Sequence, residues 1–275
     1  MKRLFKSGYF FLYLMLLSSS VYAAQSSFQI SPPPIATPEF DAGKVDKKFS
    51  ATYVGISGTG FDLSGAGVNS ITRTANSDMT ALDLSFGGFI MSGTMASGTS
   101  KGDLLVMNVP FSVNLEFQPV KNENMALILF GGPMVSLGLS SFKYQYQYQA
   151  ITSYSPLTYG TKTDTMTSST TTLLYGAQGG AQLGIKAGDF TISPFAMFQS
   201  QQGTSSTTTS SSSSGSGSSS ISIPAFTSTS YGMDILYRPW NMTLSSMLQE
   251  AAKSGSGSNS NEGFKTTIIS LSWNY

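Results

Sequence analysis

The sequence predicts an all-β protein: an antiparallel, up-and-down transmembrane β-barrel of about ten strands. Two observations lead to this fold class. Apolar and polar residues alternate with period two along several segments, as in strands with one oily face. Charged residues make up only 11% of the chain, against roughly 25% in soluble domains. Lipid would cover the outside of such a barrel, and small polar residues would fill its interior.

The N-terminal residues 1–23 predict a secretory signal peptide. Three basic residues, Lys2, Arg3 and Lys6, precede an apolar run over residues 8–17 and a stretch of small residues ending at Ala23. We expect cleavage after Ala23, with the next residue as the alternative. The apolar run is too short to cross a bilayer as a helix, and no later stretch reaches the ~20 apolar residues that a membrane helix needs. No cysteine follows for lipid attachment.

Residues 24–47 form a Pro-rich, polar lead-in that precedes the first strand. Prolines gather at 32–34 and 38, and the charged residues that follow are mixed in sign. This composition is typical of a flexible linker. A partner-binding tail in polyproline conformation is the alternative.

Residues 48–275 are expected to form the barrel. The clearest strand covers residues 103–118, where every second residue from Leu105 to Phe117 is apolar. At ~3.3 Å per residue this segment is long enough to cross the hydrocarbon. The ten expected strands cover residues 48–57, 61–74, 79–91, 103–118, 124–139, 171–186, 189–201, 227–238, 242–251 and 263–275.

The connections between these strands alternate between short and long, as in barrels with turns at one end and loops at the other. The expected short turns cover residues 76–78, 119–123, 187–188 and 239–241. The expected long loops cover residues 92–102, 140–170, 203–226 and 253–262. Residues 48–74 are the weakest hairpin, and without it the barrel would have eight strands.

The C-terminus carries the most specific pattern. Four apolar residues, Ile269, Leu271, Trp273 and Tyr275, share one face of the last strand, and the chain stops on the aromatic ring. This ending resembles the closing strand of bacterial outer-membrane β-barrels, and residues 48–275 resemble the small outer-membrane barrel superfamily that includes opacity-like and OmpW-like proteins.

The resemblance implies the outer membrane of a Gram-negative bacterium as the location. It places the lead-in and the short turns in the periplasm, and the long loops outside the cell. It also implies that lipid and lipopolysaccharide surround the barrel, and that the barrel-assembly machinery reads the four terminal apolar residues. We expect a monomer.

Strand parity places five ionisable residues on the inner face of the barrel. They are Asp83, Glu116, Lys186, Asp234 and Arg238. Charges of both signs in a narrow interior should pair, because an unpaired buried charge is costly. The main hypothesis is therefore a salt-bridge network that fills the lumen. A gate or selectivity ring and a carboxylate-pair hydrolase are the alternatives.

Two segments of the expected loops have unusual composition. Residues 142–148 alternate Phe142, Tyr144, Tyr146 and Tyr148 with Lys and Gln, which indicates a strand continuing beyond the membrane. Its aromatic residues form either an interfacial girdle or, within loop 140–170, a surface for an extracellular ligand. Residues 203–222 are almost entirely Ser, Thr and Gly, and we expect this loop to be mobile.

The residue types that are absent limit the chemistry. The chain has no His and no Cys, which excludes His-based triads, His-ligated zinc and disulfide scaffolds. A net charge of +1 argues against a nucleic-acid partner, and no motif calls for a cofactor. The sequence thus predicts a non-enzymatic barrel with envelope-structural and surface-interaction roles. A narrow channel for small solutes is the alternative, and a secreted β-sandwich adhesin is a third.

Overall fold

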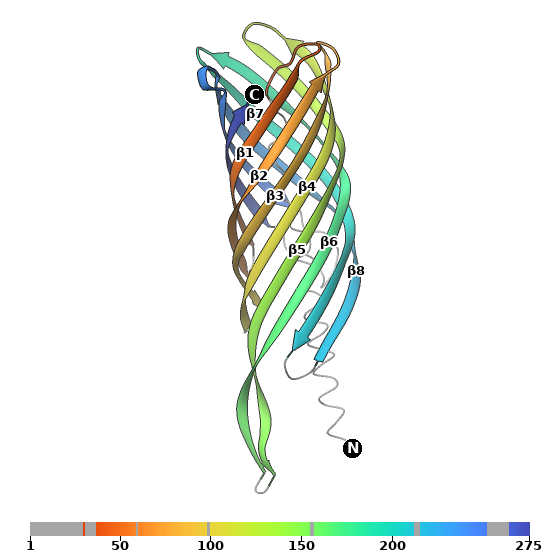
Figure 1. Ribbon diagram of the computed structural model, residues 1–275, viewed down its shortest axis with the longest axis vertical. Coiled ribbons are helices and arrows are strands. Elements are labelled where there is room, and N and C mark those ends of the chain that lie inside the picture. Colours follow the sequence, from red (N-terminus) through yellow and green to blue (C-terminus); the bar gives the residue numbers. More distant parts are fainter. Residues whose placement is uncertain are drawn as a thin grey trace.

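Ten antiparallel strands close into a single barrel in the computed structural model (Figure 1). The structure describes residues 30, 37–58, 60–97, 100–154, 157–211, 215–251 and 264–275. The strands are β1 (Val45–Gly58), β2 (Phe61–Ala75), β3 (Thr80–Ser97), β4 (Ser100–Lys121), β5 (Met125–Tyr154), β6 (Leu157–Ala187), β7 (Phe190–Ser211), β8 (Gly215–Tyr237), β9 (Met242–Ala251) and β10 (Lys265–Asn274). Each strand pairs with its neighbours in sequence, and β1 pairs with β10. The all-β, up-and-down prediction is confirmed with ten strands, and the eight-stranded alternative is wrong.

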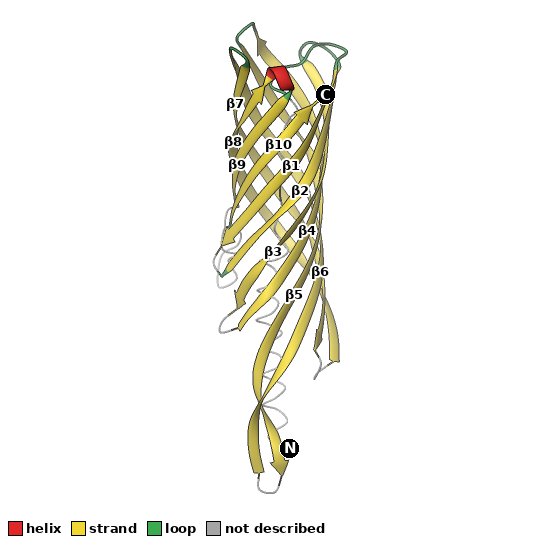
Figure 2. Cartoon of the chain, turned by 60° about the vertical axis from the view of Figure 1, so that its left-hand side comes forward, coloured by secondary structure: helices red, strands yellow, loops and turns green. Residues whose placement is uncertain are grey.

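The two ends of the barrel differ, and we name them by their connections. The turn end holds the connections at residues 76–79, 122–124, 188–189 and 238–241, together with the C-terminal residue Tyr275 (Figure 2). The hairpin end holds the opposite tips of the strands, and there β5 and β6 project beyond their neighbours (Figures 1 and 2). β5 and β6 are 30 and 31 residues long, whereas β9 and β10 are 10 residues each.

Strand structure extends through most of three expected loops. Residues 92–97 and 100–102 belong to β3 and β4, residues 140–154 and 157–170 to β5 and β6, and residues 203–211 and 215–226 to β7 and β8. The expected continuation of a strand through residues 142–148 is thereby confirmed. The expectation that residues 203–222 form a loop is wrong for residues 203–211 and 215–222, which lie in β7 and β8. The expected loop at 253–262 lies outside the described residues.

Hydroxyl pairs explain why the Ser- and Thr-rich segment is a strand. The Thr170 and Thr207 hydroxyls lie 3.0 Å apart across β6 and β7, and those of Thr172 and Ser205 lie 3.3 Å apart. All four side chains are buried on the inner face. Cross-strand hydroxyl pairs stabilise a sheet without any apolar alternation. Composition alone therefore gave the wrong expectation for this hairpin.

The barrel has an apolar outside and a partly polar inside. Leu, Phe, Ile and Tyr side chains are exposed around the whole outer wall, among them Phe86, Ile90 and Leu115. Many Ser, Thr, Asn and Gln side chains are buried on the inner wall. This is the reverse of a soluble protein and is the arrangement of a barrel surrounded by lipid. Among the described residues, no helix has the length and apolar content to cross a membrane.

Glycines on the inner wall make room for aromatic rings from the adjacent strand. A Cβ atom at Gly180 would lie 2.6 Å from the ring of Phe130, and one at Gly232 would lie 2.6 Å from the ring of Phe195. A methyl group does not fit at either distance. The rings of Phe130 and Phe195 therefore cover the backbone of the neighbouring strand, which fills the lumen and protects the glycine.

The lumen has two zones that follow from the position of each residue along its strand. Toward the turn end, four neighbouring strands carry one row of polar partners: Asp46, Arg73, Asp83 and Asn114. In the second zone, a row of mostly apolar partners runs around the ring: Met91, Gly65, Val54, Ile268, Met247, Gly232, Phe195, Gln182 and Ile128. Beyond these two zones, toward the hairpin end, buried polar side chains such as Thr170, Thr207 and Asp164 also line the interior.

Candidate functional site

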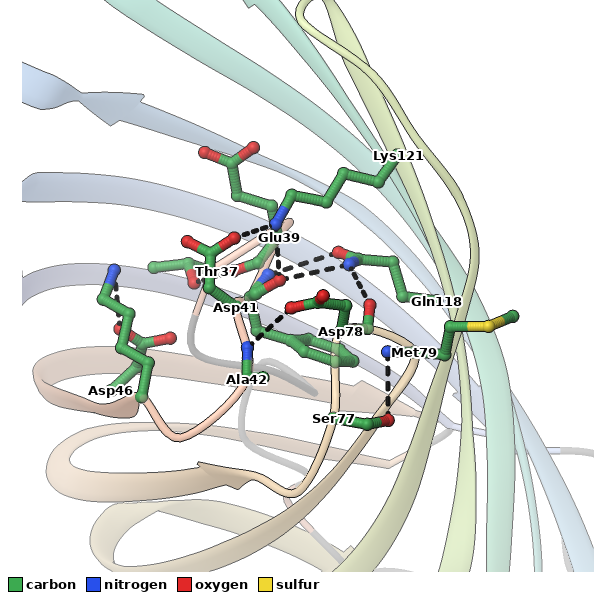
Figure 3. A network of polar contacts seen from close by, with 12 residues as sticks. Thr37, Glu39, Asp41, Ala42, Asp46, Ser77, Asp78, Met79, Gln118 and Lys121 are labelled. Carbon is green, nitrogen blue, oxygen red and sulfur yellow. Dashed lines mark hydrogen bonds and ion pairs between the residues drawn. The ribbon is translucent and has the colours of Figure 1, made fainter.

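The chain before β1 folds into the mouth of the barrel at the turn end. Residues 37–43, which we call the mouth segment, lie among side chains of the barrel wall (Figure 3). The Gly43 amide donates to the Ala75 carbonyl at 3.0 Å, and the Ala42 amide donates to Asp78 Oδ1 at 2.9 Å. Phe40 is 1% exposed. The expectation of a flexible lead-in is therefore wrong for residues 37–47, because their backbone groups have fixed partners and β1 begins at Val45.

Arg73 on β2 joins the mouth segment to the barrel wall. Its Nε atom lies 2.7 Å from Glu116 Oε2, and its Nη1 atom lies 3.6 Å from Asp46 Oδ2. The same guanidinium donates from Nη2 to the Thr37 carbonyl at 2.6 Å, and from Nη1 to the Thr37 hydroxyl at 2.8 Å and the Glu39 carbonyl at 3.2 Å. The fixed fork of an arginine suits contacts in several directions. Arg73 is fully buried, so these contacts replace its water.

Gln118 and Lys121 on β4 hold the backbone at Phe40. The Phe40 amide donates to Gln118 Oε1, and Gln118 Nε2 donates back to the Phe40 carbonyl, both at 3.2 Å. Lys121 Nζ donates to the same carbonyl at 2.7 Å. Gln118 Nε2 also bonds the Asp78 carbonyl at 2.9 Å (Figure 3). One side-chain amide thus pairs with the mouth segment in both directions, as a strand backbone would.

Two lysines at the rim pair with the acidic side chains of the mouth segment. Lys186 Nζ lies 2.7 Å from Glu39 Oε2, and Lys121 forms an ion pair with Asp41. The hydrogen bond from Lys121 holds the pKa of Asp41 below its usual range, against a smaller opposing effect of burial. These side chains are partly exposed, so solvent screens the pairs and each contributes little stability.

The barrel wall has a recess for the proline of the mouth segment. A Cβ atom at Gly184 on β6 would lie 2.3 Å from Pro38 Cβ and 2.9 Å from Pro38 Cγ. Any larger residue at Gly184 would push the proline away. The ring of Phe40 is also placed by the wall, because the Arg73 guanidinium lies 5.3 Å from its centroid, within the range of a cation–π contact.

A second ion pair lies inside the lumen. Lys48 Nζ lies 3.4 Å from Asp234 Oδ2, and Gln182 Nε2 donates to the same oxygen at 3.2 Å. The Lys48 side chain is fully buried and that of Asp234 nearly so. The pair joins β1 to β8 across the interior of the barrel.

The structure places three of the five predicted ionisable residues inside the lumen. Asp83 and Glu116 are fully buried on neighbouring strands, where Asp83 accepts from Asn114 Nδ2 at 3.1 Å, and Asp234 pairs with Lys48. Lys186 also has inward parity but lies at the mouth, and the prediction for Arg238 is wrong. Lys186 pairs with Glu39 at the rim, because β6 ends one residue later. Arg238 lies in an exposed turn and donates to the Gly188 carbonyl, because β8 ends at Tyr237.

The cations that pair with the buried carboxylates were missed by the sequence analysis. They are Arg73 and Lys48. Arg73 has the same parity as the buried Leu63 and Ile71, so its direction was readable, but it lies in the weakest expected strand. Lys48 is the first residue of its expected strand, so alternation along the strand does not show whether its side chain faces inward. Nothing in the composition of residues 37–43 indicated that they enter the barrel.

The four apolar residues of the last strand face the lipid. Ile269, Leu271, Trp273 and Tyr275 are all exposed on the outer wall. β10 closes the barrel against β1, and at its end the Tyr275 and Lys47 backbones exchange hydrogen bonds of 2.8 and 2.9 Å. The terminal aromatic residue is thus fixed at the seam. Its role as an assembly signal stays a prediction.

The chemistry available to the described residues is limited. In the parts of the chain that the structure covers, no cluster of His, Cys, Asp or Glu is arranged to hold a metal ion. The neighbouring carboxylates Asp83 and Glu116 are engaged by Asn114 and Arg73 and have no exposed surface. The polar groups at the mouth are thus engaged in holding the mouth segment.

Comparisons with known proteins give similar folds at low sequence identity. No known protein family and no curated protein matches the sequence. The barrel is similar to the outer membrane protease OmpT from Escherichia coli, with 10% identity, a TM-score of 0.49, and 84% of this chain and 96% of that chain covered. The transport unit of the autotransporter AIDA-I from Escherichia coli is 8% identical, with a TM-score of 0.42. The match covers 94% of this chain and 97% of that chain. Ail, the attachment invasion locus protein of Yersinia pestis, is 9% identical, with a TM-score of 0.33. The match covers 85% of this chain and 99% of that chain. Likenesses at this level assign no activity.

Proposed function

We propose that this protein is a non-enzymatic, integral outer-membrane β-barrel of a Gram-negative bacterium, closed at its periplasmic mouth by its own mouth segment. In this proposal the turn end faces the periplasm and the β5–β6 hairpin projects from the cell surface. The barrel contributes to envelope structure and presents the hairpin for surface interaction. The apolar outer wall, the signal-like residues 1–23 and the aromatic end of β10 support this placement.

The closed mouth is the observation that carries the proposal. Arg73, Glu116, Lys48 and Phe40 have between 0 and 1% of their surface exposed. A catalytic group must contact its substrate, and a pore must leave its lining side chains in contact with water. The groups at this level of the lumen do neither. Their chemistry is that of a packed and paired interior.

Single-cysteine labelling in intact cells tests the orientation, because the chain has no cysteine of its own. Lys162→Cys lies near the tip of the β5–β6 hairpin, and Glu123→Cys lies in a short turn; both residues are exposed. A membrane-impermeant maleimide should label the first variant in intact cells and the second only after the envelope is opened. The reverse pattern would overturn the orientation, and equal labelling would overturn the membrane placement.

A narrow channel is the second candidate, and one observation favours it. The mouth is closed by a segment that precedes the strands, and such a segment can leave without breaking the barrel. Planar bilayers separate the two candidates when the intact protein is compared with a variant that lacks residues 24–43. A closed structural barrel gives no conductance in either form. A gated channel gives conductance in the shortened form.

A further inference from the structure

We propose that the mouth of the barrel at the turn end is a peptide-binding site, which residues 37–41 occupy in cis and which takes an acidic peptide of the same chemistry from a partner protein when they leave. The proposal rests on the geometry of the mouth and goes beyond the envelope role. The ligand class is defined by the occupant Thr-Pro-Glu-Phe-Asp: a proline, an aromatic ring, and a carboxylate on each side of that ring.

The wall recognises the backbone of its occupant. Three successive recognition points exist: the Thr37 carbonyl is held by Arg73, the Glu39 carbonyl by Arg73, and the Phe40 carbonyl and amide by Gln118. Main-chain hydrogen bonds of this kind give affinity for a peptide backbone with little dependence on its side chains. They come from wall side chains, so they do not depend on the covalent link between residues 37–41 and β1.

The wall also recognises the side chains of its occupant. Pro38 fills the recess at Gly184, and the buried Phe40 ring lies against the Arg73 guanidinium. The two carboxylates of the occupant meet two rim lysines in a fixed order: Lys186 pairs with Glu39 and Lys121 with Asp41. A pocket for an aromatic anchor with charge pairs around it is the usual anatomy of a specific peptide site.

The contacts come from three strands that are distant in sequence. Arg73 lies on β2, Gln118 and Lys121 lie on β4, and Lys186 lies on β6. If the mouth segment left, these donors would lose the partners described above while keeping their positions on a closed barrel. A polar group without its partner costs free energy when it is buried. The empty mouth would therefore favour any ligand that restores those contacts.

The covalent link between residues 37–41 and β1 makes it hard for a free peptide to displace them. A tethered segment competes at an effective concentration of about the millimolar range, so a free peptide does not displace it at micromolar concentration. The site becomes measurable once residues 24–43 are removed. The probe is a fluorescent synthetic peptide with the sequence of residues 35–43, and its binding is followed by anisotropy on the purified barrel in detergent.

The expected result is saturable binding to the shortened barrel, at least about tenfold tighter than to the intact protein. Two control peptides carry Phe40→Ala, or Glu39→Gln with Asp41→Asn, and each should lose about tenfold or more. Gly184→Leu in the shortened barrel should weaken the parent peptide similarly, because its side chain would occupy the place of Pro38. The barrel state is checked by its faster migration on gels without boiling.

A folded, shortened barrel that does not bind the parent peptide overturns the proposal, and so does equal binding of the Phe40→Ala peptide. If the shortened chain does not fold, the full-length double variant Pro38→Ala, Phe40→Ala takes its place, since weakening the tethered segment should also raise binding of the free peptide. A full-length double variant that does not bind the peptide overturns the proposal as well. None of these outcomes depends on the cysteine labelling that tests the envelope role.

Discussion

The turn end and the hairpin end of this barrel are built from the same ten strands but are filled by different interactions. Near the turn end the lumen holds buried ions with fixed partners: Arg73 with Glu116, and Lys48 with Asp234. Toward the hairpin end it holds apolar side chains such as Val54, Met91 and Met247. Ion pairs depend on direction and on each partner, whereas apolar packing depends on volume. Substitutions at the two ends should therefore lower the free energy of unfolding for different reasons.

The largest effect is expected at the turn end. Arg73→Met should lower the free energy of unfolding by about 3–5 kcal/mol, because it leaves the buried carboxylate of Glu116 without its cation. Urea unfolding of the barrel in detergent measures this change. Adding Glu116→Gln to Arg73→Met should recover a large part of the loss, because it removes one stranded charge. A double variant as unstable as the single one would show that packing at Arg73 dominates.

A smaller and graded effect is expected toward the hairpin end. Met247→Ala should cost about 2–3 kcal/mol, as loss of a buried methionine leaves a cavity in an apolar cluster. Met233→Ala is the matched control, since Met233 faces outward and lipid can fill the space that it leaves. Equal losses in the two variants would contradict the packed interior. Unfolding in the same urea series gives both values.

The hydroxyl pairs of the long strands should contribute less. Thr207→Val keeps the shape of the side chain and removes its hydrogen bond with Thr170, at a cost of about 0.5–1.5 kcal/mol. Thr208→Val next to it points outward and should leave stability unchanged. Thermal unfolding of the two variants provides the comparison. If both behave like the parent, the hydroxyl pairs do not stabilise the pairing of β6 with β7.

The smallest effect concerns pH at the rim. Because the pKa of Asp41 is lowered by Lys121, its contribution is present above the unfolded pKa and is lost as pH falls through the folded pKa. Hydrogen exchange of residues 37–43 should therefore speed up between about pH 5 and pH 3, after correction for intrinsic exchange. Asp41→Asn should reduce this pH dependence, whereas Asp62→Asn at the hairpin end should not. The same pH profile in the parent and Asp41→Asn would show that other groups release the mouth segment.

The sequence predicted what the hydrophobic period controls. Strand number, the outward face and the burial of Asp83, Glu116 and Asp234 all follow from alternation. Strand ends in the Ser- and Thr-rich hairpin could not be predicted, because hydroxyl pairing leaves no apolar signal. Arg238 was misplaced because parity was carried past the end of β8.

The mouth segment could not be predicted for a different physical reason. Its composition is that of a linker, and its fixed position comes from side chains on β2, β4 and β6. The sequence does not show that these strands bring their donors together at one point. Gly65 and Gly67 also interrupt the alternation of β2, which made it the weakest of the expected strands. Donors from β2, β4 and β6 meet at the mouth segment only because the strands close into a ring.

The unequal strand lengths give the barrel a direction within the plane of the membrane. β5 and β6 form a tall wall of 30 and 31 residues, and across the ring β9 and β10 form a low wall of 10 residues each. The described strands therefore rise unevenly around the ring, and β5 and β6 extend furthest (Figure 1). Another molecule therefore contacts different lengths of strand on different sides of the barrel. Two such barrels in one membrane would meet differently with their tall sides together than with their low sides together.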